Sequence, residues 1–302
     1  MYDETLPTVE QLEVDELVCW RVHTRHGELL MAQQGAQVLS YQPHGEEPVI
    51  WLSGQATYQK GKAVRGGVPV CWPWFGDLQR NPDAIRDAYS RPTDAPAHGL
   101  VRDRDWQLIG LNTEEDGVTL SFAFDTAAQP IAEWPHAAEL QLDIHLGERL
   151  KLSLTTRNLG DSELPISQAL HTYFAVSDIR KVQIEGLDAC RYVDTLQDWK
   201  KVRQKGAVTF NGETDRIYLD TPPQLSIVDP LWKRRIFMRS EGSASAVVWN
   251  PWIEKAKRLS QFADDAWQGM LCIEHANVLD DSLILAPGAE YRLDVTLWAQ
   301  PL

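Results

Sequence analysis

The chain has 302 residues, with 29 Lys and Arg against 43 Asp and Glu, and so a formal charge of −14 with histidine neutral. Hydrophobic residues make up 43% and charged residues 24%, a composition that excludes disordered and collagen-like chains. The acidic surplus argues against a nucleic-acid partner, because phosphate backbones bind basic patches. No apolar stretch approaches the ~20 residues of a membrane helix, so no membrane partner is expected either.

The sequence indicates a cytoplasmic monomer. The acidic start has no apolar core, so no secretory signal is expected. A chain of this length can bury roughly three quarters of its unfolded surface, and neither a linker nor a repeat divides it, which predicts one domain over residues 1–302. The cysteines lie far apart without zinc-ligand spacing, and we expect reduced thiols that lie mostly in the core. They are Cys19, Cys71, Cys190 and Cys272.

The N-terminal part of the chain predicts one short helix followed by short strands. The helix is expected around Thr8–Leu17. Strand-like runs follow at residues 17–24, 36–42 and 47–52, where apolar and polar residues alternate or β-branched and aromatic residues gather.

The next segment, Lys62–Gly76, combines a cation, two glycines and an apolar run. Gly66 and Gly67, beside Arg65, would let the backbone approach a ligand closely, and the residues 72–75 form an apolar wall. The same residues also fit a tight turn that enters a buried strand. Both interpretations stay open on these residues alone.

Residues 77–97 are rich in Asp, Arg, Pro and Ala, and they predict a long surface loop. A histidine and a glycine end this loop, and charged residues alternate after them. One interpretation is a solvated strand edge with self-paired charges. The other places His98 and Arg102 in a pocket for an anionic ligand.

A period of two dominates the rest of the chain. Residues 118–124 and 291–297 alternate, and the alternating runs 140–146 and 150–154 predict a hairpin with a two-residue type II′ turn at Gly147 and Glu148. Helical signal is weak apart from a short segment at Ile253–Phe262. One buried and one wet face per strand predicts an all-β fold, a large antiparallel β-sandwich with a few short helices. Further strand-like runs occupy residues 181–186, 224–229, 234–238 and 245–250.

Two ionisable residues stand in apolar surroundings. His171 lies in the run ALHTYF, where a hydrogen-bonded core histidine is the plainer interpretation. Glu274 ends the run MLCIE, on the strand face of Met270 and Cys272. A buried carboxylate is unfavourable by several kcal/mol unless it is paired or neutralised. Together the two would form a general acid and base with environment-tuned pKa values, although sequence spacing cannot prove that they meet.

Other catalytic motifs are absent from the sequence. It has no nucleophile elbow, no phosphate-binding glycine loop and no dinucleotide fingerprint, and its histidines lack metal-ligand spacing, so we predict no metal site. The 12 tryptophans are notable, because flat aromatic faces suit the apolar faces of sugar rings.

The segments RGGVPVCWPWFG, HGLVRDRDW, ALHTYF and CIEHANV, in this order and spacing, resemble the glucose-6-phosphate 1-epimerases of the aldose 1-epimerase superfamily. The resemblance runs from about Leu30 to the C-terminus and includes the segments TDRIY and WNP. It implies a galactose mutarotase-like antiparallel sandwich and a cofactor-free interconversion of the anomers of a hexose 6-phosphate. By this resemblance His171 is the general acid and Glu274 the general base.

The resemblance also implies substrate-binding residues. His98 matches a substrate-binding histidine, Asp215 a carboxylate that holds sugar hydroxyls, and Arg65 and Arg102 the basic residues that face the phosphate. The segment 77–97 looks longer than is usual in the family. Two alternatives remain: an aldose 1-epimerase that acts on unphosphorylated sugars, and a carbohydrate-binding protein without catalytic activity.

Overall fold

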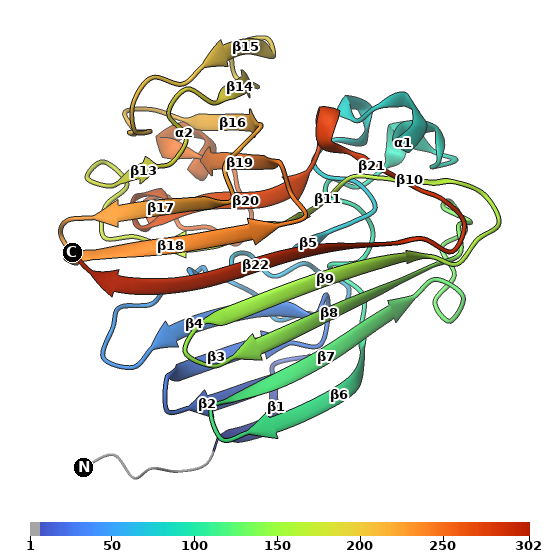
Figure 1. Ribbon diagram of the computed structural model, residues 1–302, viewed down its shortest axis with the longest axis horizontal. Helices are drawn as coiled ribbons and strands as arrows, with labels where there is room; N and C mark the ends of the chain where they lie inside the picture. The colour runs from blue at the N-terminus through green and yellow to red at the C-terminus, as the bar shows by residue number, and fades with distance from the viewer. Residues whose placement is uncertain (1–6) are drawn as a thin grey trace.

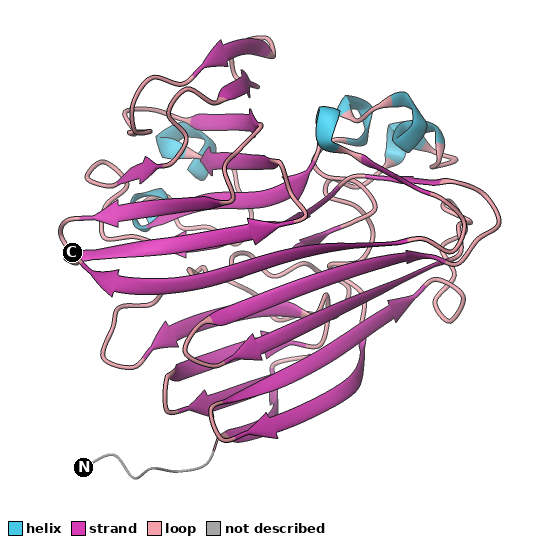
Figure 2. Ribbon diagram, in the orientation of Figure 1, coloured by secondary structure: helices cyan, strands magenta, loops and turns pink. Residues whose placement is uncertain are grey.

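The computed structural model describes residues 7–302, and most of the strands pair into two large antiparallel sheets (Figures 1 and 2). The expectation that the chain starts without a secretory signal concerns mainly residues 1–6, which lie outside this range. A smaller four-stranded sheet and a two-stranded sheet complete the β-structure of the described residues. The prediction of an all-β antiparallel sandwich is therefore confirmed.

The first eight-stranded sheet has the order β13-β17-β18-β22-β9-β8-β7-β6, and its long strands cross the front of Figure 1. The alternation of apolar and polar residues in the sequence explains why these strands form a sheet with one buried face, because every second residue of β8 is buried. Burying one such leucine stabilises the fold by about 1.5–3 kcal/mol. The strands are β6 (Gln107–Glu114), β7 (Gly117–Asp125), β8 (Ala138–Leu146), β9 (Leu150–Asn158), β13 (Gln183–Glu185), β17 (Gln224–Asp229), β18 (Arg234–Glu241) and β22 (Glu290–Pro301).

The second eight-stranded sheet has the order β15-β14-β16-β19-β20-β11-β5, with β12 also paired to β20. Its central strand β20 is buried along its whole length. The strands are β5 (Val70–Cys71), β11 (Gln168–Leu170), β12 (Tyr173–Ala175), β14 (Arg191–Asp194), β15 (Lys200–Arg203), β16 (Thr214–Leu219), β19 (Ser245–Asn250) and β20 (Met270–Asn277).

The remaining elements are short. The four-stranded sheet holds β1 (Thr8–Val14), β2 (Leu17–Thr24), β3 (Gly27–Ala32) and β4 (Gln37–Pro43), and β10 (Leu164–Ile166) pairs with β21 (Leu283–Leu285). The helices are α1 (Asp83–Asp87), α2 (Trp252–Ala256) and the 3₁₀ turns η1 (Leu78–Arg80), η2 (Pro92–Asp94), η3 (Ala266–Gly269) and η4 (Leu279–Asp281). Across residues 7–302, no helix has both the length and the apolar character to cross a bilayer.

One apolar core joins the two large sheets. It receives Phe122 and Leu142 from the first sheet, and Phe174, Val248 and Leu271 from the second. All five are buried. The sheets therefore pack face to face, as the period-two alternation predicts.

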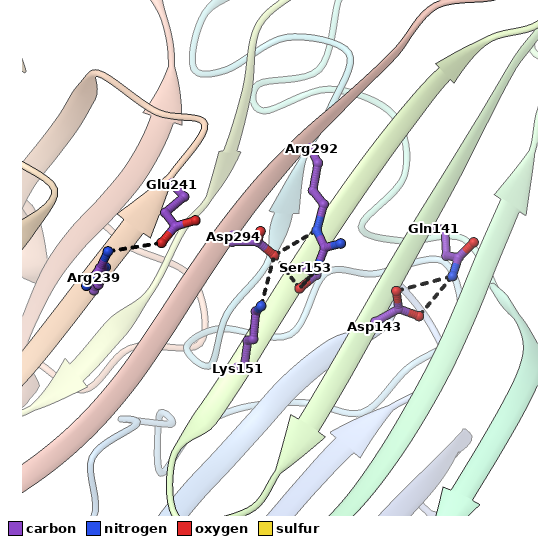
Figure 3. Close-up of polar contacts among 8 residues, drawn as sticks. All are labelled: Gln141, Asp143, Lys151, Ser153, Arg239, Glu241, Arg292 and Asp294. Carbon is purple, nitrogen blue, oxygen red and sulfur yellow. Dashed lines mark hydrogen bonds and ion pairs between the residues drawn. The ribbon is translucent and has the colours of Figure 1, made fainter.

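The outer face of the first sheet is polar. Asp294 on β22 accepts a hydrogen bond from Nε of Arg292 at 2.9 Å, lies 3.8 Å from Nζ of Lys151, and contacts Ser153 (Figure 3). Arg239 on β18 forms an ion pair with Glu241 nearby, and Gln141 contacts Asp143 on β8 (Figure 3). The charges on this face are thus largely satisfied by one another.

The structure corrects the helix expected at Thr8–Leu17. Residues 8–14 form β1, which pairs with β2 along its whole length. Long-range pairing overrides the weak local helical signal. The second expected helix is present but shorter, as α2.

The hairpin between β8 and β9 is confirmed, but its turn is not type II′. Leu146 pairs with Leu150, so three residues form the loop. Gly147 does not have the positive φ that a type II′ turn requires. Residues 47–52, expected as a strand, make only isolated bridges at Ile50 and Leu52.

Candidate active site

The candidate site is centred on His171 and Glu274, which come from neighbouring strands. β11 and β12 both pair with β20, so that Leu170 lies opposite His275 and Tyr173 lies opposite Cys272. His171 occupies the interruption between β11 and β12 and faces Glu274, with 3.3 Å between Nδ1 and Oε2. About a hundred residues separate the two in sequence, and the antiparallel register brings them together.

The imidazole of His171 is held by its surroundings. Its backbone N–H donates to the carbonyl of Pro69 at 2.9 Å. The ring stacks on Tyr173, with centroids 4.8 Å apart and planes at 7°, and it lies 5.1 Å from the ring of His98. A ring packed on two sides has little rotational freedom, so its orientation toward Glu274 is fixed before any substrate arrives.

Burial shifts both ionisable groups toward their neutral forms. His171 is only 7% exposed, and Glu274 is only 1% exposed. Burial, together with the charge of Asp215, raises the pKa of Glu274 well above its ordinary value. Burial, with further contributions from His98 and Arg102, holds the pKa of His171 well below its ordinary value. Nδ1 of His171 and Oε2 of Glu274, the two atoms 3.3 Å apart, are buried and form no hydrogen bond among the described residues.

A cavity of about 340 Å³ opens beside this pair. Its volume is in the range of small-molecule sites. Ile217, Val247 and Val278 form an apolar floor on the outer face of the second sheet. Aromatic side chains line the walls: Phe75, Tyr173, Trp199 and Trp249.

The cavity brings together five of the six site residues that the sequence and the resemblance single out. They are Arg65, His98, His171, Asp215 and Glu274. Arg102 is not among the lining residues. Its Nη2 donates to the carbonyl of Ala97 at 2.8 Å, next to His98, which places this guanidinium at the end of the segment 77–97.

Two charged residues of the cavity lining have different partners. Nη1 of Arg65 donates to the hydroxyl of Tyr173 at 3.4 Å, and its Nε to the carbonyl of Ser260 at 3.3 Å, so within residues 7–302 its charge meets neutral acceptors only. Asp215, on β16, lies 3.9 Å from Nζ of Lys255. Burial raises the pKa of Asp215, while Lys255 opposes this shift.

His98 presents a defined tautomer to the cavity. The backbone N–H of Gly76 donates to its Nδ1 at 3.4 Å, and a nitrogen that accepts cannot carry a proton, so the ring proton lies on Nε2. Burial, with the charges of Arg102 and Arg65, lowers the pKa of His98 to about 3. The ring is therefore neutral at physiological pH and can donate a hydrogen bond from Nε2.

The glycines beside Arg65 have a different role from the ligand approach considered above. A Cβ on Gly67 would lie 2.2 Å from the carbonyl oxygen of Val38, and one on Gly66 would lie 2.8 Å from that of Trp51. Both residues have positive φ. The close approach is thus to neighbouring backbone, and the glycines place Arg65 by letting the chain turn tightly.

One cluster offers metal-ligand atoms. His171, Cys272 and Glu274 place one such atom each within 4.8 Å of one another. Burial raises the pKa of the Cys272 thiol well above its ordinary value. A metal binds the thiolate, so burial works against a metal here.

Among the lining residues that were not identified from the sequence are Arg80, Asn81, Trp199 and Lys255. Arg80 and Asn81 lie in the segment expected only as a surface loop. Trp199 lies in the turn between β14 and β15. The abundance of tryptophan was the only sequence signal for Trp199, and nothing in the sequence marked Lys255.

Comparisons with known proteins identify the family of the chain. Residues 19–298 match the sequence pattern of the aldose 1-epimerase family. A provisionally named glucose-6-phosphate 1-epimerase from Cenchrus ciliaris is 35% identical over 280 residues, covering 88% of this chain and 80% of the relative. One from Escherichia coli with the same provisional name is 34% identical, covering 90% and 89%.

A solved structure shows the same fold. The crystal structure of a provisionally named mutarotase from Salmonella typhimurium has a TM-score of 0.88 at 29% identity, covering 97% of this chain and 94% of the other. The matched pattern spans nearly the whole sequence, including the interruption between β11 and β12 that holds His171 and the strand β20 that holds Glu274. The chain belongs to the aldose 1-epimerase family.

Proposed function

We propose that the protein is an isomerase that interconverts the α and β anomers of a hexose 6-phosphate, with D-glucose 6-phosphate as its substrate. The observation that carries the proposal is the opposition of His171 and Glu274 across two strands, at the edge of a cavity of sugar size. The names of the curated relatives support the choice of substrate.

The reaction needs one base and one acid. The Glu274 carboxylate takes the proton of the anomeric hydroxyl, the bond between the anomeric carbon and the ring oxygen breaks, and the ring oxygen takes a proton from His171. The open-chain aldehyde rotates about its bond to the neighbouring carbon. Closure with both transfers reversed gives the other anomer, returns the proton to His171 and leaves Glu274 as a carboxylate again. The two groups start and end with the same number of protons, so the cycle needs no cofactor.

The shifted pKa values fit these roles. Burial favours the neutral forms of both groups, which is the state of the pair once the two protons have moved. From the charged pair that starts the reaction, the raised pKa makes the Glu274 carboxylate a stronger base than an exposed carboxylate, and the lowered pKa makes protonated His171 a stronger acid. The anomeric and ring oxygens of a sugar are attached to the same carbon. Two groups 3.3 Å apart can therefore reach both oxygens. Neutral His98 and Asp215 are placed to bind hydroxyls, and Arg65 to bind the phosphate.

Substitution of the pair tests the proposal. Glu274→Gln and His171→Asn keep the side-chain shapes and remove the proton transfers, and each should slow anomer exchange of glucose 6-phosphate by roughly 10² to 10⁴, the range for a positioned acid or base. Glu139→Gln and His145→Asn on β8 are matched controls far from the cavity lining. Exchange is measured by NMR above the uncatalysed rate, with thermal melting to confirm folding.

The outcomes separate the candidate functions. Normal exchange in either site variant would contradict the assignment. Faster exchange of glucose or galactose than of glucose 6-phosphate by the native protein would favour an aldose 1-epimerase for unphosphorylated sugars. No exchange with any sugar would leave a binding protein.

We also propose that the protein works as a cytoplasmic monomer. All four cysteines are free, which suits a reducing compartment.

A further inference from the structure

A cation from the segment 77–97 reaches the mouth of the cavity. Gly76, Asp77, Arg80 and Asn81 all line it. The guanidinium carbon of Arg80 lies 5.1 Å from the ring centroid of Trp199, which comes from the turn between β14 and β15. In Figure 1, α1, which follows Arg80 in the chain, and the strands β14–β16 lie on either side of the upper part of the molecule. Arg80 and Trp199 thus join two parts of the cavity wall.

The charge of Arg80 is not neutralised by the protein. Among residues 7–302 it forms no ion pair within 4.0 Å. Lys255, another lining cation, is already paired, at 3.3 Å from Glu213 and 3.9 Å from Asp215. Arg65 meets only neutral acceptors. The cavity therefore offers two arginines, Arg65 and Arg80, whose charge remains available to an anion.

The turn that carries Arg80 is firmly tied down. Leu78 is buried, and the Asp77 carboxylate accepts from the N–H of Gln79 at 2.9 Å. Nδ2 of Asn81 donates to the carbonyl of Phe75 at 2.9 Å, and its Oδ1 accepts from the hydroxyl of Ser167, next to β11. Arg80 therefore starts from a fixed backbone position although its side chain is exposed.

Trp199 is held in an unfavourable backbone conformation. Its φ is 58°, and that of Asp198 is 50°. A bulky residue in the left-handed region is strained, and such strain gathers at sites that clamp ligands. Within this turn, the backbone N–H of Lys200 donates to the backbone carbonyl of Gln197. The backbone N–H of Leu196 donates to the carboxylate of Asp194. These bonds keep the indole facing Arg80.

We propose that Arg80 is a specificity-determining residue that binds the phosphate group of the substrate together with Arg65, and that Trp199 holds its guanidinium in place before the substrate binds. This inference rests on the proposed function. The phosphate role that the resemblance implies for Arg102 stays a prediction; its Nη2 donates to the carbonyl of Ala97, beside His98. A guanidinium that is already stacked loses less freedom when it binds phosphate through two parallel hydrogen bonds.

The test compares Arg80→Ala with Arg86→Ala, a control in the same segment whose guanidinium pairs with Asp83 and Asp87 outside the cavity lining. Arg80→Ala should raise KM for glucose 6-phosphate about tenfold or more, the size of a lost hydrogen bond to a charged group, with a much smaller change in kcat. The ratio of kcat/KM for glucose 6-phosphate over glucose should fall by a similar factor. Arg80→Lys should give an intermediate ratio, and Arg86→Ala should match the native protein.

A binding readout separates this inference from the proposed function. Inorganic phosphate should change the tryptophan fluorescence of the native protein, and the change should be lost in Arg80→Ala and in Trp199→Phe. If the native protein exchanges glucose 6-phosphate anomers but Arg80→Ala keeps the native sugar-phosphate preference, the inference is wrong and the function stands. If the native protein exchanges neither sugar, the function is wrong, and a phosphate response that does not depend on Arg80 would also overturn the inference.

Discussion

The two eight-stranded sheets use the same antiparallel pairing but treat their polar residues in opposite ways. On the outer face of the first sheet, Asp294 is surrounded by Arg292, Lys151 and Ser153 (Figure 3). On β20 of the second sheet, Glu274 and His275 are 1% exposed and carry atoms without hydrogen-bond partners among the described residues. The first sheet therefore provides stability, whereas the second sheet sacrifices some stability to keep reactive groups desolvated.

The largest stability effect should come from the core side of the first sheet. Leu142→Ala removes a buried side chain from β8 and leaves a cavity, so we expect a loss of about 2–5 kcal/mol in the free energy of unfolding. Denaturant unfolding of the purified variant measures it. A loss below 1 kcal/mol would show that this sheet is not the main source of stability.

His275→Leu should have the opposite effect and raise the free energy of unfolding. Both ring nitrogens of His275 are buried and have no hydrogen-bond partner within the described part of the chain, so an apolar side chain of similar size should stabilise the fold by about 1–3 kcal/mol near neutral pH. Burial lowers the pKa of His275 to about 4 from its ordinary 6.5. Between these pH values the unfolded chain binds more protons than the folded one, so native stability falls as the pH is lowered from about 6.5 to 4.

The variant lacks this loss, and its advantage over the native protein should therefore grow from pH 7.5 to pH 5. Paired melting curves at the two pH values measure the difference. His145→Leu is the control, since Nδ1 of His145 lies 2.9 Å from the Thr119 hydroxyl, and it should give no stabilisation. An advantage of His275→Leu that is absent, or equal at both pH values, would mean that the buried imidazole does not weaken the second sheet.

The smallest effect should come from the outer face of the first sheet. Asp294→Asn removes the charge of a side chain that is 18% exposed. We expect the free energy of unfolding to change by at most about 1 kcal/mol, and this change should decrease with added salt. Thermal melting at low and high ionic strength measures this. A loss of several kcal/mol in the free energy of unfolding would show that the polar contacts drawn in Figure 3 are required for stability rather than forming a solvated surface.

The sequence predicted what depends on local alternation. The hairpin of β8 and β9 and the C-terminal strand follow from period two, because one face of each strand is buried. The helix expected at Thr8–Leu17 was wrong because pairing of β1 with β2 depends on the rest of the sheet. Local patterns carry no information about such partners.

The site was predictable in its chemistry but not in its geometry. His171 and Glu274 stood out as polar residues in apolar runs, yet only the register of β20 against β11 and β12 brings them together. Arg80 and Trp199 had no sequence signal that linked them, since their contact depends on two turns from distant parts of the chain. Spacing in sequence cannot reveal a meeting of this kind.

The most direct measurement is a double-mutant cycle of His171→Asn and Glu274→Gln, with anomer exchange of glucose 6-phosphate as the readout. Groups that act as one unit are strongly non-additive, so the double variant should be no slower than the slower single variant within a few-fold. Losses that multiply would show that the imidazole and the carboxylate act independently, and would contradict a shared acid–base site between β12 and β20.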